Sequence, residues 1–526
     1  MKIAIAQLNY TIGDIEGNAA KIIESINKAK SQRADLVIFA EQALSGTPAF
    51  DLLRKTTFLE LCEEALTKIA RHCQGIAALV GVPVLTTEGT ISAAALLQQG
   101  RIDRYIGKKY ITARREMGFL VPSKGFEYIT IGNHRFAVVV GSDFKYEREF
   151  DPSVQTILSI NARRYGKGAL TYRYELMRRL AYVEGKNIVL VNQVGASTDL
   201  VYDGTSGALN ANGELILMMK SFEEDFQILD TEAPAAPVAV PTSIENRTRM
   251  LYEAACCGVR DYFGKNGYTK ACVGLSGGID SAVVAVLAAQ ALGRENVRAL
   301  LMPSPFSTDH SVEDARELAE RLGIAYNVIP ISSIYGQVVD TLKPVIGGTE
   351  FDATEENIQT RIRTVLLMAL QNKTGHILLN SSNKSENALG LCTLYGDTAG
   401  AFSPTGDLYK SEMYDLARYI NRTLGNPIPE NILDKAPSSE LHPGQKDTDI
   451  LPPYEVVDAI LYRMIEEGQH REEIINAGFD AEVVEKIHNM IMHNEKKRFQ
   501  FPPVLRLSMC SFGHERLMPL TNKYGD

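Results

Sequence analysis

The chain contains one short segment whose residue types and spacing suit the binding of phosphate: LSGGIDSA, residues 275–282. Two adjacent glycines let backbone N–H groups converge on an anion, and Ser276 and Ser281 add hydroxyl donors. A helical pattern follows, so the positive end of a helix dipole would face the same anion. Asp280 would repel phosphate directly, and we therefore expect it to hold a Mg²⁺ ion that bridges the phosphates. No lysine follows the glycines, so the segment is not a Walker A loop.

The residues around this loop alternate between strand and helix patterns. Short apolar runs typical of strands lie at 268–276, 297–303, 325–331 and 376–380. Helical spacing separates them at 281–293, 311–323 and 355–372. This alternation is typical of a doubly wound parallel sheet, which binds ligands beyond the carboxyl ends of its strands. The second half of the chain is therefore expected to be an α/β domain with its site at the glycine loop.

The first half of the chain also mixes strand and helix patterns. Strands are predicted at 2–8, 35–40, 76–85, 93–100, 136–141, 156–162 and 187–195, and helices at 18–30 and 58–73. This mixture predicts a layered α/β domain. The segment DTEAPAAPVAVPTS is rich in proline and alanine without a helical period, which favours an extended connector. We place the first domain at 1–230, the linker at 231–243 and the second domain at 244–526.

Length and composition exclude several classes of protein. A chain of 526 residues is too long for one core, and 45% hydrophobic with 23% charged residues is typical of folded globular domains. The net charge of −9 argues against broad nucleic-acid binding. No apolar run is long enough to span a membrane, and the N-terminus lacks the apolar core of a signal peptide. Seven cysteines without CxxC spacing indicate reduced thiols, so we expect a cytoplasmic enzyme.

SGGIDS resembles the pyrophosphate loop of the N-type ATP pyrophosphatases, which adenylate an oxygen before a nitrogen or sulfur nucleophile displaces AMP. Further segments, in order, resemble the synthetase domain of two-domain, glutamine-dependent NAD synthetases: 302–324, 356–370, 380–390, 393–404, 406–421, 436–461 and 494–503. The resemblance implies an adenine nucleotide alpha hydrolase-like fold. It also implies ATP-dependent amidation of nicotinate adenine dinucleotide (deamido-NAD) to NAD, with release of AMP and pyrophosphate, in a homo-oligomer built on dimers of synthetase domains.

The resemblance assigns roles to residues that match the motifs of the family. ATP would be bound by the loop, by two later hydroxyl groups and by a lysine: Ser276, Gly277, Gly278, Asp280, Ser281, Ser381, Ser438 and Lys410. The dinucleotide would be bound by residues of three later segments: Asn357, Arg361, Glu386 and Lys497. Side chains two residues apart on a helix do not share a face, so Arg361 and Arg363 would not both reach the site, and one could be structural. The resemblance favours Arg361 for the substrate.

Three of these residues are expected to take part in the reaction itself. Asp280 would hold Mg²⁺ together with Glu386, since two carboxylates and bound phosphate suit this ion. Lys410 would neutralise phosphate charge while the adenylate forms. Asp397 would line the substrate pocket. ATP is thus expected as co-substrate and Mg²⁺ as the metal.

In the same family the first domain resembles a nitrilase-like α-β-β-α sandwich that releases ammonia from glutamine. This chemistry uses a glutamate base, a lysine for the oxyanion and a cysteine nucleophile. Glu41 stands at the glutamate position, and Lys108 at the lysine position with Lys109 as an alternative one residue away. Gly141, in VVVGSDF, stands where the family has its cysteine.

Gly141 has no side chain with which to attack an amide. Ser142 follows it, but alternation along a strand would turn that side chain to the opposite face. The segments YITARREMGF and NARRYGKG also differ from the motifs of the family, so the whole pocket has changed. The sequence therefore predicts an NAD synthetase with an inactive glutaminase half, which uses free ammonia or ammonia from a separate protein.

Three other hypotheses stay open at this stage. The second domain could be an ATP pyrophosphatase-type ligase acting on another substrate, although YGD, DLYK and QKDTD speak against that. The chain could be a non-catalytic nucleotide-binding regulator, although the intact loop with Glu386 and Lys410 favours catalysis. The first domain could also have gained a new role in binding an effector or a partner.

Overall fold

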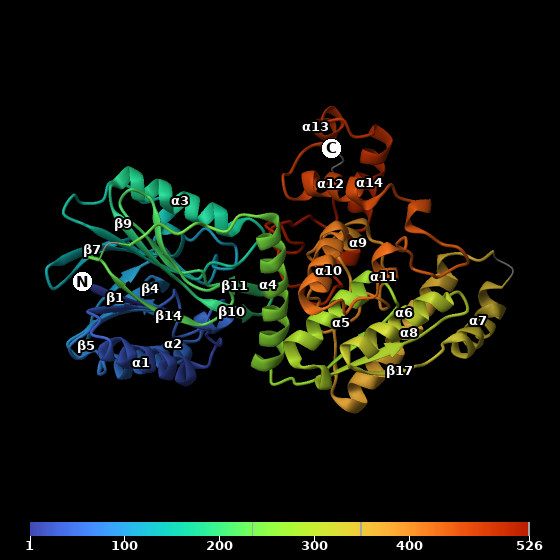
Figure 1. The fold of residues 1–526 in the computed structure, drawn as a ribbon, viewed down its shortest axis with the longest axis horizontal. Helices are drawn as coiled ribbons and strands as arrows, with labels where there is room; N and C mark the ends of the chain where they lie inside the picture. The colour runs from blue at the N-terminus through green and yellow to red at the C-terminus, as the bar shows by residue number, and fades with distance from the viewer. Residues whose placement is uncertain (234, 348–349, 524–526) are drawn as a thin grey trace. The chain divides into compact units, whose positions relative to one another are not determined.

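The computed structural model describes residues 1–233, 235–347 and 350–523, and the chain divides into two compact units, Met1–Asn246 and Arg247–Asp526 (Figure 1). The predicted connector at 231–243 has no regular secondary structure where it is described, and its position 234 lies outside the described residues. No helix in the described segments has the length and apolar character that a membrane crossing requires.

Two six-stranded sheets form the centre of the first unit. One has the order β14-β1-β2-β3-β4-β5, with bounds Asp225–Asp230, Lys2–Gln7, Leu36–Ile38, Ala77–Thr86, Gly89–Gln98 and Arg101–Gly107. The other has the order β13-β12-β9-β8-β7-β6, with bounds Leu215–Met218, Gly207–Leu209, Asn187–Asn192, Thr156–Asn161, His134–Val140 and Glu127–Ile131. A separate antiparallel pair consists of β10 (Val194–Ser197) and β11 (Leu200–Asp203).

Side chains of alternate strand residues divide this unit into four layers. Ile3 and Ile5 of β1 pack with Val138 of β7 in a core between the two sheets. Ala4 and Ala6 belong to a second core, which includes the buried sides of α1 (Ile15–Ser31) and α2 (Thr56–Ala70). Helix α3 (Ala169–Glu184) packs on β9 and β12 of the other sheet. The expected α-β-β-α sandwich is confirmed.

Parallel strands in each sheet bring three loops of the first unit together. β2 ends just before Glu41, β7 ends at Val140 just before Gly141, and β8 ends at Asn161. The backbone N–H of Glu41 donates to the Asn161 carbonyl across the two sheets, at 3.2 Å. Carboxyl ends of strands from both sheets therefore meet where the sequence places the degenerate glutaminase site.

The second unit contains a parallel four-stranded sheet with the order β17-β16-β15-β18 (Ala325–Val328, Val297–Leu301, Ala271–Gly274, Ile377–Leu378). Helices α5 (Ile279–Leu292), α6 (Asp309–Leu322) and α8 (Ala353–Thr374) lie between its strands in sequence and pack on them. Because the chain moves from β15 to β16 and β17 and then returns to β18, the strand order reverses between β15 and β18. Such reversal points are where doubly wound sheets bind ligands.

Further helices complete the second unit: α4 (Ile244–Lys265), α7 (Ser332–Ile346), α9 (Lys384–Leu389), α10 (Lys410–Leu424), α11 (Glu430–Asp434), α12 (Tyr454–Ile465), α13 (Arg471–Asn476), α14 (Ala481–His493) and α15 (Glu495–Arg498) (Figure 1). Residues of α9, α12 and α14 share a hydrophobic core that includes Leu389, Val457 and Ile487. This core fixes α9, whose residues begin six positions after the end of β18.

Candidate active site

The glycine loop joins β15 directly to α5, as the sequence predicts. Gly277 has φ +80°, and a Cβ atom there would lie 2.2 Å from the Ser311 carbonyl oxygen, so only glycine fits. The Gly278 N–H donates to Ser276 Oγ at 3.2 Å, and Ser281 Oγ donates to the Gly278 carbonyl at 3.1 Å. No described side chain caps α5, which leaves its first N–H groups for a ligand.

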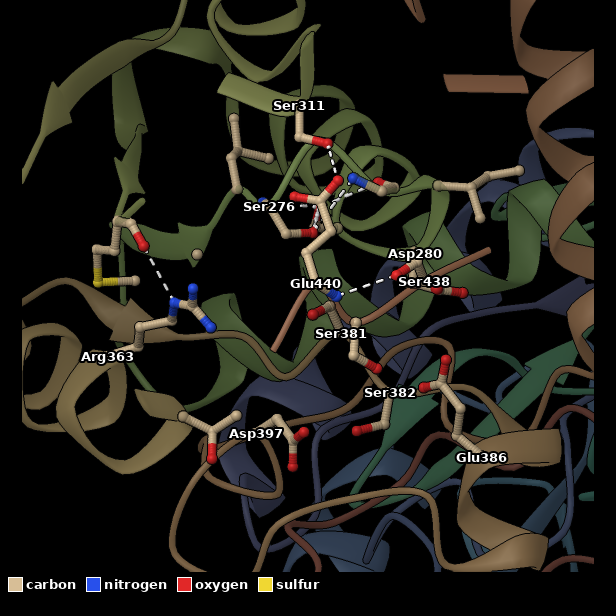
Figure 2. A pocket seen from close by; sticks show the side chains of 18 of the residues that line it. Ser276, Asp280, Ser311, Arg363, Ser381, Ser382, Glu386, Asp397, Ser438 and Glu440 are labelled. Atoms are coloured by element: carbon tan, nitrogen blue, oxygen red, sulfur yellow. Dashed lines mark hydrogen bonds between the residues drawn. The ribbon is translucent and has the colours of Figure 1, made fainter. Parts of the chain in front are cut away.

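A cavity of about 300 Å³ opens beside this loop at the reversal point of the sheet. Its wall is built from the segments that follow β15, β16 and β18 and from the 435–447 segment. Figure 2 shows its labelled side chains, and the lining includes these predicted site residues: Ser276, Gly278, Asp280, Ser281, Ser381, Glu386, Asp397, Lys410 and Ser438. Most residues that the sequence assigns to ATP and metal thus face a single cavity.

Two carboxylates and one lysine meet inside this cavity. Lys410 Nζ lies 2.5 Å from Asp280 Oδ2 and 3.4 Å from Glu386 Oε1. Burial, together with the neighbouring Asp280, raises the pKa of Glu386 to about 8, although Lys410 opposes the shift. Burial alone would lower the pKa of Lys410, but Asp280 and Glu386 hold it well above its usual value. One ammonium group therefore does not fully offset the cost of ionising both carboxyl groups in this buried place.

This carboxylate pair suits a Mg²⁺ ion that is shared with a phosphate ligand. The described residues contain no group of three or more His, Cys, Asp or Glu side chains that could enclose a metal ion. Mg²⁺ is commonly held by one or two carboxylates, with substrate phosphates and water as its other ligands. The raised pKa of Glu386 gives the same indication, because a nearby cation would relieve the cost of ionising a buried carboxyl group.

Three residues that the sequence assigns to the dinucleotide bind one loop, the segment 390–397, from outside the cavity. Lys497 Nζ donates to the carbonyls of Gly390 and Cys392 at 2.7 and 2.8 Å. Arg361 Nε donates to the Leu394 carbonyl at 3.2 Å, and Asn357 accepts from Thr393 Oγ1 at 2.5 Å. On its inner side this loop presents Asp397, whose pKa is raised to about 6 by burial.

Arg363, rather than Arg361, lines the cavity. Its Nε donates to the Met302 carbonyl at 3.0 Å, and among the described residues the other guanidinium nitrogens make no hydrogen bond (Figure 2). The family resemblance favoured Arg361, and the spacing indicated only that the two side chains leave the helix in different directions. The Arg363 side chain points toward the carboxyl end of β16 because of the way α8 packs against the sheet. The spacing of residues along a helix does not reveal that packing.

Glu440 is a second cavity residue that the sequence analysis did not identify. Its carboxylate accepts hydrogen bonds from Ser311 Oγ at 2.7 Å and Thr308 Oγ1 at 2.9 Å (Figure 2). Thr308 is the N-cap of α6, so an acidic side chain covers the positive end of that helix. The motif SSEL already contained this residue, but nothing in the spacing connected it to a helix more than 100 residues earlier.

In the first unit, the predicted glutaminase positions converge. Lys108 Nζ lies 3.0 Å from Glu41 Oε1, and both side chains are buried. Gly141 has φ +60°, and a Cβ atom there would lie 2.7 Å from both Glu41 Oε2 and Lys108 Nζ. Lys109 instead pairs with Glu147 at 3.3 Å, so Lys108 is the lysine at this site.

A second glutamate also pairs with Lys108. Glu116 accepts from Lys108 Nζ with both carboxylate oxygens at 2.9 Å, so one lysine is held between two glutamates. Burial alone would lower the pKa of Lys108, but Glu41 and Glu116 raise it. The ammonium group is thus charged and already paired on both sides.

Neither the hydroxyl of Ser142 nor a cysteine thiol of this unit is paired with Glu41 or Lys108 in the part of the chain that the structure describes. Ser142 Oγ donates to the Tyr110 carbonyl at 3.1 Å and accepts from Thr112 Oγ1 at 3.3 Å, away from the Glu41–Lys108 pair. The two cysteines of this unit, Cys62 and Cys73, lie in the core between the first sheet and its helices. Burial raises the pKa of both thiols to about 12, so neither is a thiolate at neutral pH.

Each of the two units matches a known protein family. Residues 251–501 match the model of the NAD synthase family, and residues 2–235 match that of carbon-nitrogen hydrolases. The chain is 38% identical to a glutamine-dependent NAD(+) synthetase of Synechocystis sp., with 99% of each chain covered. It is 37% identical to the enzyme of the same name in Thermotoga maritima, covering 100% of this chain and 99% of that one.

Solved structures give the same result. A glutamine-dependent NAD+ synthetase from Acinetobacter baumannii, in complex with ADP, is 34% identical and superposes with a TM-score of 0.77 over 99% of this chain and 98% of that chain. The fold also matches that of a protein from Cytophaga hutchinsonii, with a TM-score of 0.87 at 19% identity over 99% and 98% of the two chains. The chain belongs to the NAD synthetase family, in the two-domain form that joins a carbon-nitrogen hydrolase domain to an NAD synthase domain.

Proposed function

We propose that this NAD synthetase amidates deamido-NAD with ammonia that its own first unit does not produce. One observation carries the proposal: at Gly141 the strand end points between Glu41 and Lys108, where a nucleophile would have to stand, and carries no side chain. The Glu41–Lys108–Glu116 group then acts as a buried ion cluster in a scaffold. Free ammonia or a separate ammonia-donating protein would supply the nitrogen.

The synthetase half retains the groups that adenylation requires. The carboxylate of deamido-NAD attacks the α-phosphorus of ATP and pyrophosphate leaves; ammonia then attacks the acyl carbon and AMP leaves. We assign the pyrophosphate to the loop and the N-terminus of α5, with Ser381 and Ser438 as further ATP ligands. When bound at Asp280 and Glu386, Mg²⁺ would neutralise charge on the departing pyrophosphate. Lys410 would hold both carboxylates in place and face the phosphates.

The dinucleotide would lie against the segment 390–397. Asn357, Arg361 and Lys497 fix the backbone of this loop through the contacts described above, and Asp397 projects from it into the cavity. We propose that these residues position the loop for deamido-NAD. We also propose a cytoplasmic homo-oligomer built on dimers of the second unit, as the family resemblance implies.

Restoring the missing thiol will not restore glutamine use. We expect Gly141→Cys to release no measurable glutamate from glutamine, because its Cβ would fall within 2.7 Å of Glu41 Oε2 and Lys108 Nζ. The new side chain must displace a buried ion cluster and must also adopt a positive φ, which a non-glycine residue rarely does. Glutamate release measured with glutamate dehydrogenase checks this result. Glutamine-dependent synthesis by Gly141→Cys at the rate seen with ammonium would show that the pocket is intact.

Arg363 is expected to bind an anionic oxygen of a nucleotide. Arg363→Lys keeps the charge and loses the planar fork, so we expect the KM of one nucleotide to rise roughly tenfold with a smaller change in kcat. Separate titrations of ATP and deamido-NAD show which nucleotide it contacts. The exposed Arg418→Lys is the matched control. Unchanged KM values for both nucleotides in Arg363→Lys would contradict the assignment.

A further inference from the structure

Asn383 is completely buried and links the Asp280 carboxylate to the backbone of Glu386, the two residues assigned to the metal. Its Nδ2 donates to Asp280 Oδ1 at 3.0 Å, and its Oδ1 accepts from the Glu386 N–H at 3.0 Å. We propose that Asn383 is a positioning residue that fixes the separation of Asp280 and Glu386 and thereby sets their affinity for Mg²⁺. The inference rests on the proposed function, because it takes these two carboxylates as the metal ligands.

The fold makes such a bridge necessary. Asp280 belongs to the first turn of α5, which follows β15, whereas Glu386 belongs to α9, which follows β18. The two helices start from neighbouring strands on opposite sides of the reversal point, and they are more than 100 positions apart in the sequence. Asn383 is the N-cap of α9 and is therefore fixed to the start of that helix. Its side-chain nitrogen donates to Asp280 in the first turn of α5.

Lys410, unlike Asn383, contacts both carboxylates, and its contribution differs in kind. Its ammonium group competes with a metal ion for Asp280 Oδ2, at 2.5 Å, and for Glu386 Oε1, at 3.4 Å. The amide of Asn383 is neutral, so it orients Asp280 through Oδ1 without neutralising it. With Oδ1 held by Asn383, the orientation of the Asp280 carboxylate is defined before a metal ion arrives, which is how outer-shell partners strengthen metal binding.

Only asparagine fulfils both tasks at this position. Aspartate would cap α9 equally well, but it has no N–H to donate and would add a third negative charge beside Asp280 and Glu386. Serine would also cap the helix, but its hydroxyl group is too short to reach Asp280 at the same time. The sequence NKSE therefore carries its asparagine for the metal site as well as for the helix.

Helix α9 is anchored independently of this amide. Lys384 Nζ pairs with Asp407 at 3.1 Å and with Glu466 at 2.5 Å, and Ser385 Oγ donates to Asp458 Oδ1 at 2.5 Å. Both anchors are buried. A substitution that keeps the cap and removes only the donor to Asp280 should consequently leave α9 in place, so its effect on metal binding can be separated from unfolding.

The test compares Asn383→Ser with Asp480→Ala in the full chain. Asn383→Ser keeps a cap and loses the contact with Asp280, whereas Asp480→Ala removes the side-chain cap of the remote helix α14. Binding of Mn²⁺, as a Mg²⁺ substitute, is measured by electron paramagnetic resonance of the free ion with a non-hydrolysable ATP analogue. The Mg²⁺ dependence of NAD synthesis from ammonium is measured beside it.

We expect Asn383→Ser to weaken Mn²⁺ binding and to raise the half-saturating Mg²⁺ concentration about 10-fold to 100-fold, with much of kcat recovered at saturating Mg²⁺. Asp480→Ala should lower Tm and leave both metal measurements unchanged. Wild-type metal binding in folded Asn383→Ser, or an equal shift in Asp480→Ala, would overturn the inference. If Asn383→Ser does not fold, Asn383→Thr, which also keeps a capping hydroxyl and has no N–H to donate to Asp280, replaces it with the same expected loss. A failure of this inference can be distinguished from a failure of the proposed metal site. If Asp280 and Glu386 do not hold a metal ion, even the wild-type protein would bind no Mn²⁺ with the ATP analogue.

Discussion

With ammonium chloride as nitrogen source, the protein is expected to convert deamido-NAD to NAD in the presence of ATP and Mg²⁺, and with glutamine it is expected to make none. Loss of a catalytic nucleophile costs about 10⁶ in kcat in a well-studied hydrolase, which would put glutamine turnover below detection. Ser142 does not substitute for the thiol, since its hydroxyl group faces Tyr110, and Lys108 is paired with two glutamates. NAD formation is followed by enzymatic reduction to NADH and its absorbance.

The labelling version of this experiment excludes contaminating ammonia. Glutamine labelled with ¹⁵N in its amide is mixed with unlabelled ammonium, and the isotope content of the product carboxamide is measured by mass spectrometry. The NAD formed is expected to be unlabelled. A ¹⁵N content of the carboxamide equal to that of the glutamine amide would contradict the proposal. At fixed total ammonium the rate should also rise with pH, in proportion to free ammonia, because the unprotonated form is the nucleophile.

The local parts of the site were predictable from the sequence. A loop such as SGGIDS contains most of its own geometry, because Ser276, Gly278 and Ser281 form hydrogen bonds with one another within a few residues. Strand ends are equally local, so Glu41, Lys108 and Gly141 could each be placed from a short motif. Their convergence required only that parallel strands carry their carboxyl ends to the same edge.

Contacts between distant segments were not predictable in this way. Arg363 and Glu440 contact backbone or side chains from other elements, and the direction of each depends on how those elements pack. Helix α7 and several strands of the first unit were also absent from the sequence analysis. Strands such as β12 and β13 are only three and four residues long, too short for an alternating pattern to stand out.

Asp280→Asn is expected to abolish NAD synthesis from ammonium, with a loss of roughly 10²–10³ or more in kcat, the size seen when one preorganised charge-stabilising group is removed. The substitution keeps the size and the position of the side chain at the start of α5, so the loop should stay folded. It removes the negative charge 2.5 Å from Lys410 Nζ and one of two carboxylates assigned to Mg²⁺. Pyrophosphate release and NAD formation should fall together, because the adenylate does not form.

The control for this variant is Asp415→Asn, which lies on α10 and forms an exposed ion pair with Arg418 at 3.4 Å. An exposed pair contributes little, so Asp415→Asn should keep wild-type activity and stability. Circular dichroism confirms that both variants are folded. Wild-type pyrophosphate release by folded Asp280→Asn would show that the carboxylate is not needed for adenylation, and it would remove the metal site on which the role of Asn383 depends. A loss of activity in Asp280→Asn but not in Asp415→Asn would mean that adenylation depends on the carboxylate at the start of α5. Synthesis from ammonium but not from glutamine by the unaltered chain would mean that the first unit, with Gly141 in place of a nucleophile, does not supply the nitrogen.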